Sequence, residues 1–132
     1  MSDQLMRMAA IGLGGALGAV LRYGMGLACA SVWGDRFGHA TLLVNVVGCF
    51  VLGLLMHEAW VAAEKPVGVW HAAVTVGLLG GLTTFSTFGY QTIRHLDAGE
   101  PGLAMANIAL NVVLGLAAAA GGLSIARSLW PT

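Results

Sequence analysis

Charged side chains are scarce in this sequence. Only 9% of its 132 residues are Asp, Glu, Lys or Arg, whereas about a quarter of the residues in an ordinary soluble domain are charged. Hydrophobic residues make up 58% of the chain. This shortage of charge excludes a soluble globular domain and predicts a membrane protein.

The uncharged runs divide the chain into four predicted transmembrane helices. They cover about residues 8–32, 40–61, 66–95 and 101–126, with a break in the third near residues 80–84. Each run is close to or above the ~20 residues that cross ~30 Å of hydrocarbon as a helix. An open sheet would leave backbone amides unpaired in lipid. We therefore expect an all-α membrane protein, with residues 1–132 forming a single four-helix domain.

Acidic residues are absent from the middle of every span, since Glu58 lies at an edge. A proton-coupled exporter would ordinarily need such a carboxylate as its relay. This argues against a small dual-topology multidrug-type cation exporter, which we keep as the alternative function beside a non-transporting helical scaffold. Ser86 has no histidine or lysine deep in a span to activate it, so we expect no enzyme.

Positive charges are evenly divided between the two ends of the predicted bundle. One face would hold Arg7, Lys65 and Arg127, and the other Arg36 and Arg94, with Arg22 nearer that second face. Orientation normally follows an excess of Lys and Arg on the cytoplasmic side. Two interpretations stay open: insertion in both orientations with pairing to an inverted copy, or a weak bias amplified by a partner.

The stretch GGLTTFSTFGY, residues 80–90, places glycines and four hydroxyl side chains where lipid is expected. Gly77, Gly80 and Gly81 followed by consecutive threonines favour a broken helix. A break frees carbonyls, which must then face protein, water or a cation. The sequence thus predicts a discontinuous third helix with backbone oxygens suited to a cation.

Helical spacing resumes after the predicted break. Phe85 and Phe88 share one face, flanked by Thr84, Thr87 and Gln91. Ring edges are electropositive, so two phenylalanines beside hydroxyl and amide donors can line a path for a small anion. Ordinary aromatic packing is the competing interpretation.

Other spans contain isolated polar groups and small residues. In the second span, Asn45 lies one turn after Thr41 and shares a face with Gly48. In the fourth span, Asn107, Asn111 and Gly115 share one face. These amides could line an ion path or form interhelical hydrogen bonds.

The first span carries Gly14 and Gly18 four residues apart, which favours close helix packing. Arg22 follows one turn later. Its stem can reach the interface, so an architectural anchor is favoured over an anion contact.

Three segments together resemble a known family: GALGAVLRY, TLLVNVVGCF and, above all, GLLGGLTTFSTFGYQT. They are similar to the Fluc fluoride channels, also called the CrcB family. The resemblance implies a dual-topology antiparallel homodimer of four-helix subunits in a bacterial inner membrane. It also implies two fluoride pores, a structural sodium ion at the dimer centre and passive export of fluoride that lowers its toxicity. Fluoride, a second copy and membrane lipid are the implied partners, and no nucleic acid is expected.

The resemblance also assigns roles to positions of this chain. The fluoride pore residues it implies are Phe85, Phe88, Asn45, Ser86, Thr87 and Thr41, and the amide stripe of the fourth span adds Asn111 as a further candidate. The sodium ion would be held by the backbone carbonyls of Gly80 and Thr83. Architectural positions are Arg22, Gly14, Gly18, Gly48, Gly77 and Gly81. Where the family often carries a tyrosine and serines on the fourth helix, this chain has Asn107, Asn111 and Gly115.

Overall fold

The structure, a computed structural model, describes residues 2–34, 36–57 and 68–131. Every regular element in these ranges is helical. The first two helices are α1 (Asp3–Trp33) and α2 (His39–Leu55). The third span is assembled from α3 (Val69–Ala72), a π-helical segment η1 (Ala73–Leu78), α4 (Leu79–Leu82) and α5 (Phe85–Asp97), and the chain ends in α6 (Pro101–Leu129).

Three of these spans are long and apolar enough to cross a membrane, namely α1, the third span and α6. The shorter apolar helix α2 has 17 residues, about 25 Å at 1.5 Å per residue. Residues 58–61 and 66–67, which the sequence assigned to the second and third spans, lie outside the described residues.

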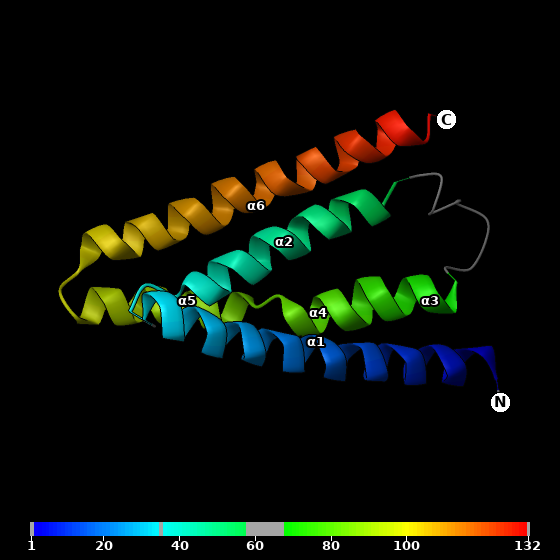
Figure 1. The fold of residues 1–132 in the computed structure, drawn as a ribbon, viewed down its shortest axis with the longest axis horizontal. Helices are drawn as coiled ribbons and strands as arrows, with labels where there is room; N and C mark the ends of the chain where they lie inside the picture. Colours follow the sequence, from blue (N-terminus) through cyan, green and yellow to red (C-terminus); the bar gives the residue numbers. More distant parts are fainter. Residues whose placement is uncertain (1, 35, 58–67, 132) are drawn as a thin grey trace.

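The four passes run alternately up and down the bundle, and both termini lie at the same end (Figure 1). In this view α1 lies along the third span, and α2 lies along α6. The described structure is therefore two antiparallel helix pairs joined into a single bundle.

Glycines allow α1 to approach the third span closely. A Cβ on Gly18 would meet the Leu78 carbonyl oxygen, and one on Gly14 would meet that of Ala73. Glycines of the third span contact α1 in the same way, since a Cβ on Gly81 would meet the backbone of α1. Such small residues let two helix backbones touch without side chains between them.

The pair of α2 and α6 is packed in the same manner. A Cβ on Gly122 would meet the Phe50 carbonyl oxygen, and one on Gly53 would meet that of Ala119. Because both pairs are close-packed through backbone contacts, their polar residues are held at defined positions across the bundle.

The third span is interrupted at two threonines. Helix α4 ends at Leu82, and the backbone is extended at Thr83 (φ −78°, ψ 155°) and Thr84 (φ −153°, ψ 113°) before α5 begins. The Thr84 hydroxyl accepts the Thr87 backbone N–H at 3.2 Å, as a helix N-cap does. The interruption lies in the region expected from the sequence, but the glycines do not cause it, since Gly80 and Gly81 remain within the helical turn of α4.

Candidate functional site

Asn45 of α2 holds the interruption of the third span open. Its Oδ1 accepts the Thr84 backbone N–H at 2.8 Å, and its Nδ2 donates to the Thr84 carbonyl at 3.3 Å. Thr84 is 7% exposed, so water does not readily reach its backbone. The Asn45 Oδ1 therefore supplies the acceptor that the break removes from the Thr84 N–H, and its Nδ2 adds a bond to the carbonyl of this N-cap residue.

A chain of asparagine amides continues from this point into α6. Asn45 Nδ2 donates to Asn111 Oδ1 at 3.0 Å, and Asn111 Nδ2 donates to Asn107 Oδ1 at 3.0 Å. Asn107, which is fully buried, donates to the Thr92 hydroxyl at 2.9 Å. Each amide in the chain thus fixes the orientation of the next, and both Asn111 polar groups are already bonded within the protein.

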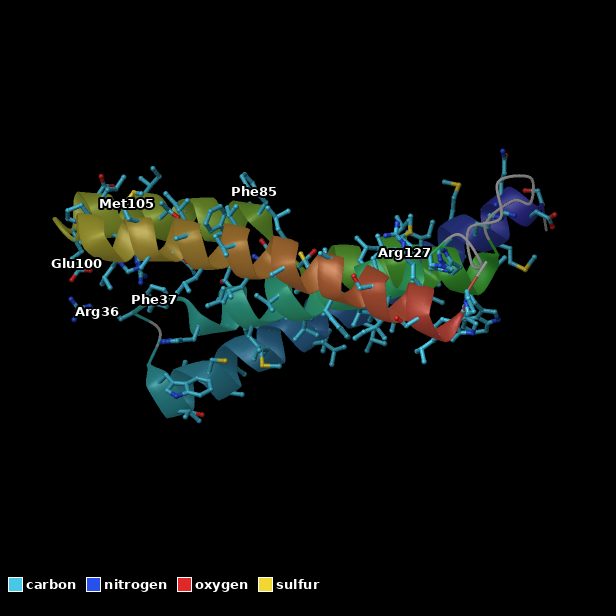
Figure 2. The ribbon with its side chains drawn as sticks, turned by 90° about the horizontal axis from the view of Figure 1, so that it is seen from above. Arg36, Phe37, Phe85, Glu100, Met105 and Arg127 are labelled. Atoms are coloured by element: carbon cyan, nitrogen blue, oxygen red, sulfur yellow. The ribbon has the colours of Figure 1, made fainter. Side chains whose placement is uncertain are left out.

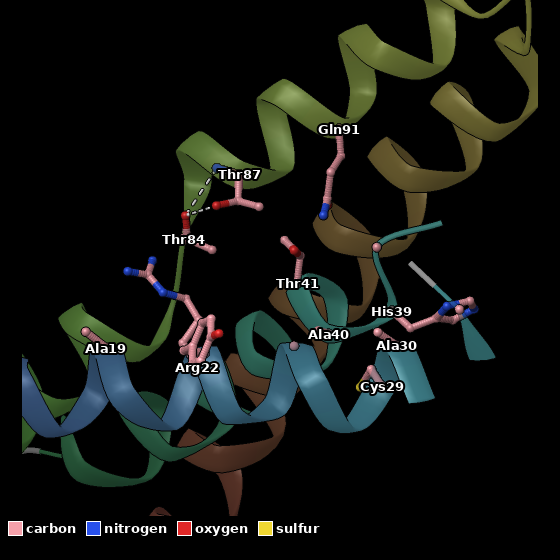
Figure 3. Close-up of a pocket in the computed structure, with 14 residues that line it drawn as sticks. Ala19, Arg22, Cys29, Ala30, His39, Ala40, Thr41, Thr84, Thr87 and Gln91 are labelled. Atoms are coloured by element: carbon pink, nitrogen blue, oxygen red, sulfur yellow. Dashed lines mark hydrogen bonds between the residues drawn. The ribbon is translucent and has the colours of Figure 1, made fainter. Parts of the chain in front are cut away.

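A cleft of about 460 Å³ lies on one side of the break (Figure 3). We call it the threonine cleft. It is lined by Ala19, Arg22, Tyr23, Gly26, Cys29, Ala30, Gly34, Gly38, His39, Ala40, Thr41, Thr84, Thr87 and Gln91. Figure 3 shows Thr41 from α2 and Gln91 from α5 pointing into the same space.

The electrostatics of the threonine cleft favour an anion. Among the described residues that line it, Arg22 is the only Arg, Lys, Asp or Glu, and its Nη1 donates to the Thr83 carbonyl at 3.5 Å. The first residue of α2, His39, and the N-cap of α5, Thr84, also line the cleft. Helix N-termini carry partial positive charge, so two of them reinforce the arginine.

A second cleft, of about 350 Å³, lies on the other side of the break, and we call it the phenylalanine cleft. It is lined by Asn45, Gly48, Cys49, Leu52, Thr75, Leu79, Gly80, Thr83, Thr84, Phe85, Phe88, Asn111 and Val112. The rings of Phe85 and Phe88 meet edge to face, with centroids 5.3 Å apart and planes at 62°. Phe85 is 82% exposed and projects away from the bundle (Figure 2).

The structure divides the residues predicted for the pore between the two clefts. Thr41 and Thr87 line the threonine cleft. The phenylalanine cleft collects Asn45, Phe85, Phe88 and Asn111. Ser86 lines neither cleft, and its hydroxyl lies 3.2 Å from that of Thr84.

The residues predicted to be architectural lie in three different places. Gly14, Gly18, Gly77 and Gly81 lie where α1 meets the third span. Gly48 faces the Thr83 side chain, and Arg22 lines the threonine cleft.

Thr84 and Gln91 also have a clear place in the site. The sequence placed them beside the phenylalanine face but did not assign them to the pore. Thr84 borders both clefts. Gln91 continues the face of Thr84 and Thr87 one turn further along α5. The sequence feature that points to both residues is the row of hydroxyl and amide side chains at helical spacing. This row alone does not show whether a member lines the pore or caps the helix.

The carbonyls proposed for sodium have lost their usual helical partners. The amide four residues after Gly80 is that of Thr84, which donates to Asn45 instead. The amide four residues after Thr83 is that of Thr87, which donates to the Thr84 hydroxyl. Both residues line the open phenylalanine cleft. Carbonyls released at a broken helix are typical ligands of a sodium ion. The Gly80 carbonyl therefore fits one, whereas the Thr83 carbonyl could bind one only beside the Arg22 Nη1 that already donates to it at 3.5 Å.

A family model described as CrcB-like protein, Camphor Resistance (CrcB), matches residues 9–123 of this chain. The chain belongs to this family. Every residue that lines the two clefts falls within the part of this CrcB-like chain that the model matches. With its apolar helices, this member of the family is a multi-pass integral membrane protein.

Relatives of this CrcB-like chain are similar to it over nearly their whole length. A Pseudomonas fluorescens protein is 42% identical over 118 residues, which cover 89% of this chain and 94% of the relative. A Methanopyrus kandleri protein is 44% identical over 123 residues, which cover 93% and 91%. Both relatives are named fluoride-specific ion channel FluC. The similarity therefore includes all four passes, and these names describe a channel and not an enzyme.

Proposed function

We propose that this chain forms a fluoride-selective channel that lets fluoride leave the cytoplasm passively and so lowers its toxicity. The observation that carries this proposal is the meeting of two clefts at Thr84, where the third span is interrupted between hydroxyl donors and phenylalanine edges. The names of its relatives support fluoride as the ion. A bacterial inner membrane is the location we propose.

Fluoride would first be drawn into the threonine cleft by Arg22 and the two helix N-termini. The Thr84 hydroxyl donates its only hydrogen to Thr87 Oγ1 at 3.0 Å. The hydrogen of Thr87 is consequently free to donate to an anion, as is that of Thr41 from the opposite wall. Neutral donors can replace water around the ion without trapping it as a mid-pore cation would.

Beyond Thr84, the ion would pass the phenylalanine cleft. The edges of Phe85 and Phe88 present weak positive charge, and closely spaced weak donors in a narrow path favour a small halide over a larger one. The Asn111 amide is engaged with Asn107. It would therefore act mainly by holding Asn45 in place.

The channel would be an antiparallel homodimer built from chains inserted in both orientations. The even division of Lys and Arg supports this arrangement. Further support comes from Phe85, which is 82% exposed although it lines a partly polar cleft. A second copy over this face would close the phenylalanine cleft and complete its wall.

A sodium ion at the dimer centre would be held by the Gly80 and Thr83 carbonyls of each copy. It would neutralise their partial negative charge and stabilise the interruption. Replacing sodium by a large organic cation should then abolish fluoride flux. Flux that persists at full rate in such a buffer would overturn the sodium proposal alone.

The proposal is tested by fluoride efflux from liposomes that contain the purified protein. Phe85→Ile and Phe88→Ile should each reduce efflux by about tenfold or more, the loss expected when a donor of about 1.5 kcal/mol is removed. Trp70→Ile is the matched control. Trp70 is an aromatic residue of the third span that is 84% exposed and lines neither cleft, so its variant should conduct normally. Unchanged rates in both phenylalanine variants would contradict a role for the ring edges.

A cation exporter remains the alternative from the sequence, but no observation favours it. Neither cleft is lined by an Asp or Glu in the described parts of the chain, and such a carrier would ordinarily use one to exchange protons.

A further inference from the structure

Gly38, which leads into α2, lines the threonine cleft, and Arg36 and Phe37 before it line the neighbouring groove. We call residues 36–38 the rim of the threonine cleft. Gly38 is the N-cap of α2, is buried and has a left-handed backbone with φ +81°. The Gln91 side-chain amide packs against it so closely that a Cβ on Gly38 would collide with Gln91 Oε1. The position of residues 36–38 therefore sets where Gln91 and the N-terminus of α2 lie in the cleft.

A cluster of charged side chains attaches this rim to the turn between α5 and α6. Arg36 forms an ion pair with Glu100, and the two lie at the same end of the bundle (Figure 2). His95 Nδ1 lies 3.3 Å from Glu100 Oε2, and Arg94 Nη2 donates to the Arg36 carbonyl at 3.4 Å. We call these four side chains the rim clamp. The clamp connects the rim to α5, the helix that carries Thr87 and Gln91 of the cleft.

Glu100 is the centre of the rim clamp. Hydrogen bonds from Arg36 and then His95 hold the pKa of its carboxyl below the usual range. An ionised carboxylate only accepts hydrogen bonds, so His95 Nδ1 must be the donor. His95 is 2% exposed, so the surrounding side chains hold the donor of this bond in a fixed position inside the bundle.

One further titratable group, His39, faces the same region. It lines the open groove beside Arg36 and Glu100. The Phe37 ring lies between the two histidines, with its centroid 5.2 Å from that of His39 and 6.2 Å from that of His95. The rim is thus packed against an aromatic group as well as bonded to the clamp.

We propose that Glu100 is a positioning residue for fluoride access, whose ionised carboxylate holds residues 36–38 so that Gly38, Gln91 and the N-terminus of α2 keep the mouth of the threonine cleft in shape. This inference rests on the proposed channel function, because it concerns the same cleft. Without the carboxylate, the rim loses its ion pair to the turn and, through it, the link to His95, and it keeps only the bond from Arg94 to the Arg36 carbonyl. The helix N-terminus and the Gln91 amide then shift away from the path of the ion.

Fluoride current across a planar bilayer containing purified protein tests this role. At pH 7, Glu100→Gln and Arg36→Glu should each lower the current by up to about fivefold, as expected for loss of an ion pair near the surface. Combining Arg36→Glu with Glu100→Arg should recover most of the current, because the pair is restored with its charges exchanged. Asp97→Asn is the matched control, since it removes a carboxylate at the same end of α5 that forms no bond in the clamp.

A pH profile separates positioning from general structural support. Since pairing lowers the pKa of Glu100, the carboxylate stays ionised as the pH falls to the ordinary value of about 4.3 and is lost only as the pH falls further, through the lowered pKa. At constant fluoride-ion activity, the wild-type current should therefore hold down to about pH 4.3 and fall only in more acidic solution. Glu100→Gln has no proton to gain and should show no such fall.

The outcomes distinguish this inference from the channel function. A wild-type protein that carries no fluoride current contradicts the proposed function and, with it, the role of Glu100. Wild-type current beside equal current in Glu100→Gln and Arg36→Glu overturns the inference and leaves the channel standing. If the single variants do not fold, the wild-type profile decides, because a current unaffected by acid below about pH 4 overturns the role of the carboxylate.

Discussion

Asn45 and Thr84 exchange two hydrogen bonds, so that a side chain of α2 satisfies the backbone of the interrupted third span in both directions. The distances are 2.8 Å for the bond from the Thr84 N–H and 3.3 Å for the bond to its carbonyl. Since Thr84 borders both clefts, Asn45 holds in place the point at which they meet. The shape of the proposed ion path thus depends on one amide from a neighbouring helix.

Replacing Asn45 tests this dependence. Asn45→Ala should lower stability in detergent by about 1 to 2 kcal/mol, the upper range for an interhelical bond in a membrane protein, and should nearly abolish fluoride efflux. Asn45→Asp keeps an acceptor for the Thr84 N–H but loses both donor bonds and adds negative charge beside the path. Its carboxylate oxygen would face the Thr84 carbonyl and Asn111 Oδ1 without a hydrogen to donate, so this variant should be no more stable than Asn45→Ala and should conduct no better. Efflux equal to wild type in both variants would show that the amide does not shape the path.

Arg22 is expected to attract fluoride into the threonine cleft. Arg22→Gln should lower the fluoride current by about tenfold at low ionic strength, with the difference shrinking as an impermeant salt is added. Arg22→Lys keeps the charge and should retain most of the current. Equal currents in wild type and Arg22→Gln at low salt would restrict Arg22 to an architectural role.

Hydropathy was enough to predict the helical spans, because an apolar run of ~20 residues without charge is the length and composition that a membrane-spanning helix requires. The interruption near residues 80–84 also followed from the sequence, which pointed to the glycines and the consecutive threonines together, and the structure places it at the threonines. Glycine can either break a helix or admit a neighbouring backbone, and Gly81 does the second because α1 lies against it. The threonines break the helix because Asn45 and the Thr84 hydroxyl supply the missing partners.

The division of the site into two clefts was not predictable from spacing along one helix. Ser86 and Thr87 are adjacent hydroxyl residues, yet only Thr87 faces a cleft, because successive residues of a helix point in different directions around its axis. The engagement of Asn111 with Asn107 was equally hidden. A helical stripe shows that two amides share a face, but it does not show whether they bond to each other or to an ion.

Gly38 provides a test of the rim that does not involve charge. Gly38→Ala should impair fluoride efflux, because the new Cβ would displace the Gln91 amide. The matched control is Gly99→Ala. Gly99 also has a positive φ, of 72°, but has open space around its Cα, so both variants carry a similar backbone cost of about 1 to 2 kcal/mol. Equal efflux from the two variants would show that the contact with Gln91 has no effect on conduction.

Close packing between α1 and the third span is tested at Gly18. Gly18→Ala would place a Cβ against the Leu78 carbonyl and 2.8 Å from the Leu82 nitrogen, and should cost about 1 to 3 kcal/mol in detergent stability. Gly12→Ala meets nothing within 4 Å and should leave stability nearly unchanged. Similar unfolding midpoints for the two variants would contradict the backbone contact.

A fluoride-selective electrode applied to liposomes loaded with potassium fluoride, with sodium present on both sides of the membrane, gives the most direct test of the central claim. Once a potassium ionophore removes the charge barrier, vesicles that contain the purified protein should release their fluoride rapidly, and chloride-loaded vesicles should not release chloride. Fluoride that stays inside at the rate of protein-free vesicles would contradict the account.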